Sequence, residues 1–322
     1  MFNYMTLMEK LHARLAADSR PDRTNTGTAS IFGTSLEFDL RESFPLLPFR
    51  QMNFKDIVTE LVWFLRGETN IKFLEDNGCK WWSNQCSKKG EVGPMYGAQW
   101  RGYTDRDGSI KPDQFARAVN TLVNDPFSRR ILVDSWEASK IPENNCDYDE
   151  NVENGKMAIA PCHLLYQFYV EEIDGKRHLS CKFDMRSSDT FLGLPANIAS
   201  YALLTHIVAG LTGMVPYRLC YGGGDVHLYS NHDKACTELL RQWREDTEQQ
   251  MDERGISRIN RYRKWEYLTD TRCPKYQLPE EFLEKVTLED LDFKVEGLVE
   301  LLVSGLSDYK PQPPILARIA LS

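Results

Sequence analysis

Hydrophobic positions at helical spacing predict several helices along the chain. Near the start, Tyr4, Leu7 and Leu11 fall on one face of a surface helix. Further amphipathic or apolar runs predict helices at 54–65, 114–124 and 198–214. The last of these is apolar all round, which is typical of a buried core helix. The charged stretch 238–275 is also helix-prone, and we interpret it as a surface element.

Other segments carry the composition of β-strands. They are rich in β-branched and aromatic residues and are bounded by turn residues. These segments are 36–40, 131–136, 163–170 and 179–189, with a further polar strand after a glycine turn in 221–232. Arg129 and Arg130 fall next to the second of them, and adjacent residues of a strand point to opposite faces. One of the two side chains is therefore expected to leave the solvent face or to reach a partner.

Composition limits the class of protein and of ligand. The chain has 322 residues, of which 42% are hydrophobic and 27% charged, as in a globular protein with a substantial core. No apolar run reaches the roughly 18 residues of a membrane helix, so we expect no membrane span. The net charge of −8 argues against a nucleic-acid surface, so an anionic ligand needs a local arginine cluster. The 8 cysteines show neither a CxxC pair nor zinc spacing, which predicts no metal and a cytoplasmic location, in the cell or in an infected host cell.

Cys162 is the candidate nucleophile. It lies between Pro161 and His163 at the entrance of a predicted strand, where a thiol can be both exposed and rigidly held. A buried core cysteine is the commoner fate of a free thiol. The chain also offers arginines that can stabilise a thiolate and bind a phosphate group, namely Arg23, Arg129, Arg130 and Arg186.

Other side chains suit a ring-bearing, phosphorylated substrate. Asn197 can read a heterocycle edge with one donor and one acceptor, while His227 and Tyr229 can bond sugar hydroxyls. Glu60 falls in an apolar helix, either as a paired edge group or as a functional acid. A tryptophan pair, Trp81 and Trp82, can stack on a flat second ligand.

Seven stretches of the chain carry recognisable motifs. They are DRTNTGT (22–28), ELVWFLRGETNIKFL (60–74), GPMYGAQWR (93–101), DPFSRRILVDSW (125–136), MAIAPCHLLYQFYV (157–170), RSSDTFLGLPANIASYALL (186–204) and GGDVHLYSNH (223–232). In this order they resemble the thymidylate synthase family over nearly the whole chain. The cysteine, LGLP and GGD motifs together are highly specific, while the match weakens at 138–156, at 241–290 and at the C-terminus.

The resemblance implies an enzyme that transfers one carbon from 5,10-methylenetetrahydrofolate to C5 of dUMP through a covalent adduct on Cys162. The other implied catalytic residues are Glu60, Tyr96, His163, Arg186 and Asp189. The implied dUMP-binding residues are Arg23, Arg129, Arg130, Arg186, Ser187, Asn197, His227 and Tyr229. The implied folate-binding residues are Trp81, Trp82, Gln85, Asp189, Leu192, Gly193 and Ala196.

The resemblance also implies the architecture and the partners. The expected fold is α/β (α+β), a three-layer arrangement with a large twisted mixed sheet, in a single catalytic domain spanning 1–322. The segment 241–290 is expected to be an inserted or divergent surface element. Two copies are expected to pack sheet to sheet as a homodimer, in which Arg129 and Arg130 complete the partner's phosphate site. We expect dUMP and a reduced folate as ligands, and no nucleic acid.

Departures from the family pattern bear on the product. Ala196 replaces a phenylalanine, Trp81 a smaller aliphatic residue and Gln85 a second tryptophan, and the C-terminal tail is longer. A water molecule admitted at these positions would take the place of hydride and yield 5-hydroxymethyl-dUMP. This pattern narrowly favours that product, as in a viral dUMP hydroxymethylase. The alternative is thymidylate synthesis proper, with hydride transfer to give dTMP and dihydrofolate. A (d)CMP hydroxymethylase and a non-catalytic nucleic-acid-binding relative are further alternatives.

Overall fold

The computed structural model describes residues 1–21, 26–256 and 261–317. The helices in this part of the chain are α1 (Phe2–Ala17), α2 (Phe54–Leu65), α3 (Lys72–Asp76), α4 (Tyr96–Arg101), α5 (Gln114–Asn124), η1 (Ala138–Lys140), α6 (Tyr148–Glu153), α7 (Gly193–Leu211), η2 (Ser230–His232), α8 (Asp233–Glu253), α9 (Arg261–Thr271), α10 (Glu280–Lys285) and α11 (Leu298–Ser304). The strands are β1 (Thr28–Asp39), β2 (Leu132–Asp134), β3 (His163–Ile173), β4 (Lys176–Asp189), β5 (Val215–Tyr229), β6 (Lys275–Tyr276) and β7 (Leu306–Ser307).

A mixed sheet forms the centre of the molecule. Over the described residues it has 5 strands in the order β1-β5-β4-β3-β2. β4 and β5 run parallel because α7 connects them as a crossover, whereas the other neighbours run antiparallel. This arrangement confirms the α/β (α+β) fold with a mixed sheet.

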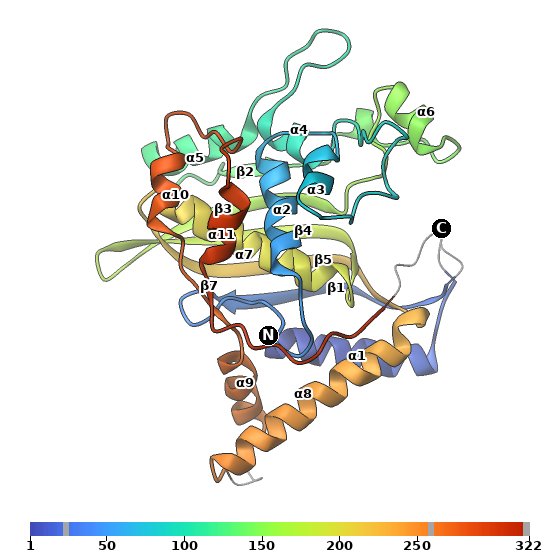
Figure 1. The fold of residues 1–322 in the computed structure, drawn as a ribbon, viewed down its shortest axis with the longest axis vertical. Coiled ribbons are helices and arrows are strands. Elements are labelled where there is room, and N and C mark those ends of the chain that lie inside the picture. The colour runs from blue at the N-terminus through green and yellow to red at the C-terminus, as the bar shows by residue number, and fades with distance from the viewer. Residues whose placement is uncertain (22–25, 257–260, 318–322) are drawn as a thin grey trace.

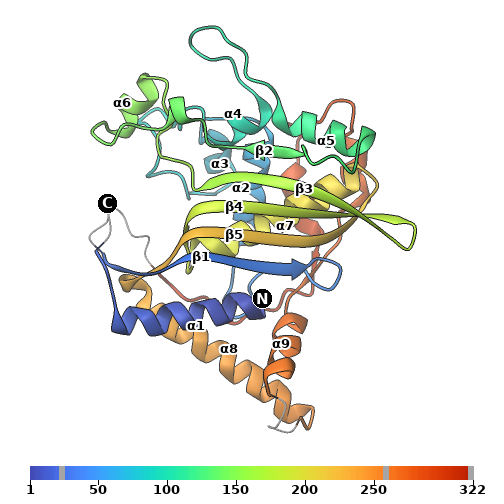
Figure 2. The same ribbon diagram turned by 180° about the vertical axis from the view of Figure 1, so that it is seen from behind.

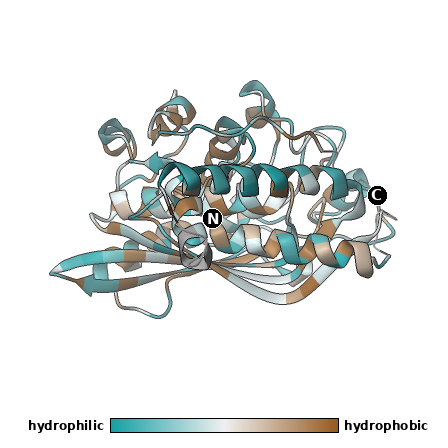
Figure 3. Ribbon diagram, turned by 90° about the horizontal axis from the view of Figure 1, so that it is seen from below, coloured by the Kyte–Doolittle hydropathy of each residue, from teal (hydrophilic) through white to brown (hydrophobic). Residues whose placement is uncertain are grey.

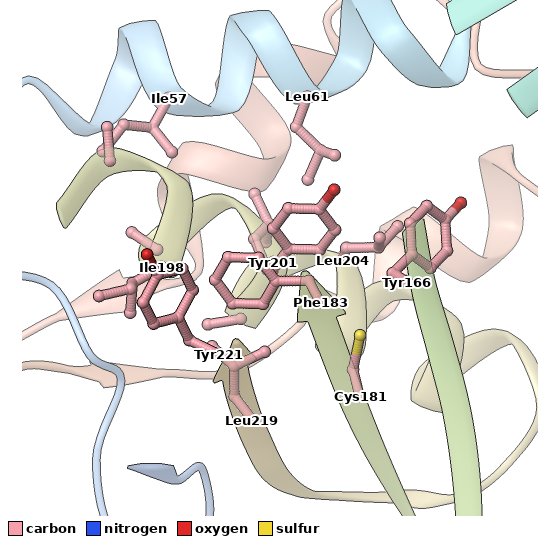
Figure 4. Packing of buried hydrophobic residues seen from close by; sticks show 14 of the residues in the cluster. Ile57, Leu61, Tyr166, Cys181, Phe183, Ile198, Tyr201, Leu204, Leu219 and Tyr221 are labelled. Carbon is pink, nitrogen blue, oxygen red and sulfur yellow. The ribbon is translucent and has the colours of Figure 1, made fainter. Parts of the chain in front are cut away.

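Helices cover one face of this sheet. α7 packs against it, α2 lies on α7, and α11 lies on α2 (Figure 1). In the core between α7 and the sheet, Tyr201 of α7 stacks on Phe183 of β4 with ring centroids 4.2 Å apart and ring planes 12° apart. Figure 4 shows these rings below Ile57 and Leu61 of α2. α7 has the length and hydropathy of a membrane helix, but 89% of that stretch is buried, as expected for a core helix.

The opposite face of the sheet is not covered by a helix of the described chain. Figure 2 shows the strands from that side, and Figure 3 shows them along the lower edge with the helices above. Tyr169 of β3 and Leu132 of β2 point to this face and are 60% and 40% exposed. Apolar side chains on an open sheet face are typical of a surface that packs against another protein.

Local signals explain why the predicted helices begin where they do. α2 starts after Asn53, whose side chain accepts a hydrogen bond from the Asp56 N–H at 3.3 Å. α5 starts after Asp113, whose side chain accepts from the Ala116 N–H at 2.8 Å. The structure therefore confirms both predicted helices with the predicted ends. The predicted N-terminal helix is also present, although its inner face, including Phe2, is buried.

Two local predictions are wrong. The glycines 222–224 lie inside β5 rather than in a turn. A Cβ at Gly224 would lie 2.8 Å from the Arg186 carbonyl oxygen, so the glycine permits close approach of two strands. Arg129 and Arg130 lie in a turn before β2 and are both exposed, so the alternating faces of a strand do not separate them.

Candidate active site

Cys162 lies in a bend directly before β3 and is half-buried. Its backbone N–H donates to the Tyr96 hydroxyl at 2.8 Å, and its carbonyl accepts from the Arg186 N–H at 3.0 Å. Tyr96 comes from α4 and Arg186 from β4, so two separate elements hold the cysteine backbone. The structure thus provides the rigidly held thiol that the sequence predicts.

The Arg186 guanidinium lies next to the thiol. Its Nε donates to the Pro161 carbonyl at 2.9 Å and its Nη2 to the Ala160 carbonyl at 2.8 Å. These bonds hold Nη2 at 4.0 Å from the Cys162 Sγ. A guanidinium beside a sulfur atom stabilises the thiolate, which is the nucleophilic form. The Trp136 ring flanks the same guanidinium at 5.9 Å.

Glu60 is a buried carboxyl group in the middle of α2. It is 8% exposed, and its Oε1 accepts a hydrogen bond from the Trp82 indole N–H at 2.7 Å. Burial raises the pKa of Glu60 to about 7, and the Trp82 hydrogen bond partly opposes that rise. A carboxyl group with this pKa can both donate and accept a proton near neutral pH.

Trp82 and Tyr96 connect this carboxyl group with the backbone of Cys162. Its ring is 5.9 Å from the Tyr96 ring, and the Tyr96 hydroxyl accepts from the Cys162 N–H. Burial also raises the pKa of Tyr96 far above its usual range, so this tyrosine remains protonated at neutral pH. The side chains of Glu60, Trp82 and Tyr96 and the backbone of Cys162 therefore form one contiguous set of contacts.

His163 and Asn197 form the next part of the site. His163 Nε2 lies 3.2 Å from Asn197 Nδ2, and His163 Nδ1 lies 3.1 Å from the Tyr201 hydroxyl. Burial lowers the pKa of His163 to about 4, so its ring is neutral at pH 7. Asn197 is half-buried at the start of α7, where its amide can meet a ligand.

Asp189 and Gly193 lie at the junction of β4 and α7. The Asp189 Oδ1 accepts from the N–H groups of Phe191 and Leu192 at 2.9 and 3.3 Å, which shapes the turn into the helix. A Cβ at Gly193 would lie 3.6 Å from Asn197 Oδ1 and 4.0 Å from Asp189 Cβ. The carboxylate, the glycine and the amide therefore meet at one surface.

The predicted sugar-binding residues lie beside this turn. His227 pairs with Asp189 across β4 and β5, and its ring packs at 4.9 Å from the ring of Tyr229. His227 is nearly buried, whereas Tyr229 is half-exposed. Ser187 is half-buried on β4, opposite Asp225 of β5.

The described arginines of the predicted cluster do not all lie at the thiol of one chain. Arg23 lies outside the described residues. Arg129 and Arg130 precede β2, and the Ile131 carbonyl accepts from the Phe168 N–H of β3 at 2.9 Å. Phe168 follows Cys162 by six residues of extended chain, which is about 20 Å. These two arginines therefore cannot reach the thiol of their own chain, and only Arg186 among the described arginines of the predicted cluster touches it.

The predicted folate-side residues differ in exposure. Trp82 is buried, whereas Trp81, Gln85 and Leu192 are half-buried. Ala196 is 6% exposed, directly before Asn197 on α7. The Gln85 N–H donates to the Trp82 carbonyl at 2.9 Å, so this glutamine lies one turn beyond the indole that holds Glu60.

Sequence reasoning missed two residues that contact the site. Trp136 flanks Arg186, and Tyr201 holds His163. The sequence did carry a signal for Tyr201. It follows Asn197 by four residues, and residues four apart lie on the same face of a helix. No group of three or more His, Cys, Asp or Glu side chains in the described part of the chain is arranged to hold a metal ion.

Comparison with known proteins gives the family. A family model described as thymidylate synthase matches residues 2–287. A thymidylate synthase of Buchnera aphidicola subsp. Schizaphis graminum is 44% identical over 242 residues, which cover 75% of this chain and 84% of that protein. The chain therefore belongs to the thymidylate synthase family, whose members are transferases that carry a one-carbon unit from 5,10-methylenetetrahydrofolate to dUMP.

Proposed function

We propose that this protein converts dUMP to dTMP by reductive methylation and releases dihydrofolate. The observation that carries the covalent attack on dUMP, a step that both candidate products share, is the placement of Cys162, which is held by Tyr96 and lies 4.0 Å from the Arg186 guanidinium. The similarity to a thymidylate synthase supports methylation better than the hydroxymethylation that the sequence pattern narrowly favoured.

The first step is attack by the Cys162 thiolate on C6 of dUMP. The bond from sulfur to C6 makes C5 nucleophilic, and Arg186 favours the charged form of the sulfur before attack. Asn197 reads the pyrimidine edge, because its amide offers one donor and one acceptor. His227 and Tyr229 bind the sugar, and Ser187 and Arg186 bind the phosphate together with Arg23.

Glu60 handles the protons of the reaction. Its pKa of about 7 allows it to supply a proton toward the substrate and to accept one back. The Trp82 indole holds this carboxyl group at 2.7 Å, and His163 and Tyr96 shape the wall between Glu60 and the thiol.

The residues beside Asn197 suit a flat hydrogen-bonding cofactor. Asp189 offers a carboxylate to a pterin, and Gly193 offers a surface without a side chain. Leu192, Ala196 and the indoles of Trp81 and Trp82 add apolar contacts, with Gln85 beside them. When bound, the folate supplies the methylene carbon and the hydride.

A homodimer completes the phosphate site in this proposal. The open sheet face with Tyr169 and Leu132 offers a surface for a second copy. Arg129 and Arg130 are exposed and precede β2. There they lie beside Phe168 of β3, too far from the start of that strand to reach their own Cys162. Arg129→Ala is therefore expected to weaken phosphate binding at the partner's site. A monomer by sedimentation that remains fully active when dilute would contradict the dimer.

The cytoplasm is the compartment that fits the cysteines best. No disulfide joins the 8 cysteines, all of which lie in described segments. Reduced thiols are typical of a cytoplasmic protein, and Cys162 requires a reducing environment to act as a nucleophile.

Hydroxymethylation is the second candidate. Ala196 is small beside the substrate-reading amide, and the polar Gln85 is half-buried next to Trp82, so both positions offer a water molecule less apolar bulk than a phenylalanine and a second tryptophan would. Incubation with dUMP and 5,10-methylenetetrahydrofolate, followed by mass spectrometry of the nucleotide, separates the two products. We expect dTMP with one dihydrofolate per nucleotide. 5-Hydroxymethyl-dUMP with no dihydrofolate would favour the second candidate.

A further inference from the structure

The turn between β4 and α7 carries the carboxylate that the proposed function assigns to the folate. The Asp189 Oδ1 accepts from the Phe191 and Leu192 N–H groups at 2.9 and 3.3 Å. Both bonds fall on one oxygen, and the Asp189 side chain is 21% exposed, so its other oxygen can meet a ligand. The direction of that second oxygen therefore depends on where the two N–H groups point.

Two donors from distant parts of the chain hold the same turn through its carbonyl groups. The Tyr4 hydroxyl of α1 donates to the Thr190 carbonyl at 2.7 Å, and the Arg50 Nη2 donates to the Phe191 carbonyl at 2.5 Å. The direction of each bond is fixed, because a carbonyl oxygen only accepts and a guanidinium only donates. The Arg50 guanidinium also lies 4.8 Å from the Phe191 ring, so it holds this residue by backbone and side chain.

These contacts fix two consecutive peptide units at both ends. Tyr4 holds the carbonyl of the unit between Thr190 and Phe191, and Arg50 holds the carbonyl of the unit between Phe191 and Leu192. The N–H groups of the same two units are the ones that bind the carboxylate. Because a peptide unit is planar, a carbonyl that is held in place also sets the direction of the N–H on its other side.

We propose that Tyr4 and Arg50 are positioning residues for folate binding, because they fix the two peptide units that orient the Asp189 carboxylate. The inference rests on the proposed function in one respect, which is that Asp189 holds the pterin. The reaction steps proposed above assign no role to Tyr4 or Arg50.

Burial makes both donors hard to replace. Tyr4 and Arg50 are 0% and 7% exposed, so water does not readily take over either hydrogen bond. Burial also raises the pKa of Tyr4 far above its usual range, so its hydroxyl keeps the proton that it donates. Removal of either donor leaves a buried carbonyl without its partner, and the peptide unit can then rotate to find another.

The first test is Tyr4→Phe, which keeps the ring and removes the hydroxyl. The measured quantities are the dissociation constant of tetrahydrofolate in the presence of dUMP and the dissociation constant of dUMP alone. Tetrahydrofolate lacks the methylene carbon, so no turnover disturbs the measurement. We expect the value for tetrahydrofolate to rise about three- to tenfold and the value for dUMP to stay unchanged. An equal loss of affinity for both ligands would indicate general damage to the core and would overturn the inference.

Tyr166→Phe is the matched control. Tyr166 and Tyr4 are both 0% exposed, but the Tyr166 hydroxyl has no hydrogen-bond partner among the described residues. This variant therefore removes a buried hydroxyl without releasing a carbonyl. We expect both dissociation constants to match those of the wild type. A loss of tetrahydrofolate affinity as large as that of Tyr4→Phe would count against the inference.

Arg50→Met tests the second donor, because methionine keeps a long side chain and cannot donate. We expect tetrahydrofolate binding to weaken about tenfold or more, since a hydrogen bond from a charged donor is stronger than one from a hydroxyl. The dissociation constant of dUMP should again stay unchanged. Tyr4→Phe decides the inference on its own if Arg50→Met does not fold.

Hydrogen exchange on the free proteins tests the turn without any folate. We expect the Phe191 and Leu192 N–H groups to exchange faster in Tyr4→Phe and Arg50→Met, relative to the amides in the body of α7, and at the wild-type rate in Tyr166→Phe. Unchanged exchange, or an unchanged dissociation constant of tetrahydrofolate, in folded Tyr4→Phe would overturn the inference. Failure of the wild type to bind tetrahydrofolate beside dUMP would instead refute the proposed function, while hydrogen exchange would still decide whether the two residues hold the turn.

Discussion

Glu60→Gln should stabilise the protein at alkaline pH while it removes the enzyme's proton-transfer group. Burial raises the pKa of Glu60 from 4.5 to about 7 in the folded protein. The folded state therefore holds the carboxyl proton more tightly than the unfolded state does. The free energy of unfolding therefore falls as the pH rises from the pKa of Glu60 in the unfolded chain to its pKa in the folded protein. Above pH 7 this loss of stability is complete. At 1.36 kcal/mol per pKa unit this cost is about 3 kcal/mol.

Glutamine mimics the protonated acid, because it is neutral and keeps an oxygen acceptor for the Trp82 N–H. At about pH 5 most of the cost is absent in the wild type, so the two proteins should have similar free energies of unfolding. At about pH 8.5 the variant should be more stable by about 3 kcal/mol. Turnover should fall by orders of magnitude at both pH values, because an amide cannot exchange a proton in this range.

The assay is urea denaturation of both proteins at one protein concentration, since the stability of an oligomer depends on concentration. The quantity of interest is the change with pH in the difference between the two unfolding free energies. An identical pH dependence of stability for the two proteins would refute the argument that Glu60 carries a raised pKa. Substantial turnover by the variant would refute its part in proton transfer.

Three further substitutions test separate contacts. Trp82→Phe removes the indole N–H that opposes the effect of burial, so the pKa of Glu60 should rise further and the acidic limb of the pH–rate profile should move to higher pH; an unmoved limb would speak against the contact. Cys162→Ser should fold and bind dUMP but lose turnover by several orders of magnitude, and near-normal turnover would exclude the nucleophile. Asp246→Asn replaces a carboxylate that accepts from both Arg272 and Gln312, so it should lower the free energy of unfolding by about 2 kcal/mol and expose the chain around Gln312 to proteolysis. Unchanged cleavage kinetics would show that the carboxylate does not anchor that part of the chain.

Elements governed by local signals were predictable from the sequence. α2 and α5 begin after Asn53 and Asp113, and these caps lie within four residues of the N–H groups that they satisfy. The glycines before Asp225 carry an equally strong local signal, which misled because glycine also permits the close approach of two strands. Gly224 lies against the Arg186 backbone, and that contact depends on the pairing of β4 with β5.

The site itself depends on contacts between distant residues. Arg186 meets Cys162 because β3 and β4 pair antiparallel, and composition alone cannot give that register. The family resemblance supplied the set of residues, but not the hydrogen bond from Trp82 to Glu60. Tyr201 was missed although its spacing from Asn197 placed it on the same helix face, because a tyrosine in an apolar helix looks like any other core residue until its hydroxyl partner is known.

The identity of the product is the central claim, and isotope transfer tests it most directly. The substrate pair is dUMP with 5,10-methylenetetrahydrofolate that carries deuterium at C6 of the pterin, the position that loses hydride when dihydrofolate forms. Reductive methylation predicts that the deuterium appears in the methyl group of dTMP, together with dihydrofolate. A 5-hydroxymethyl-dUMP product without deuterium, formed while the folate keeps its label, would contradict the account.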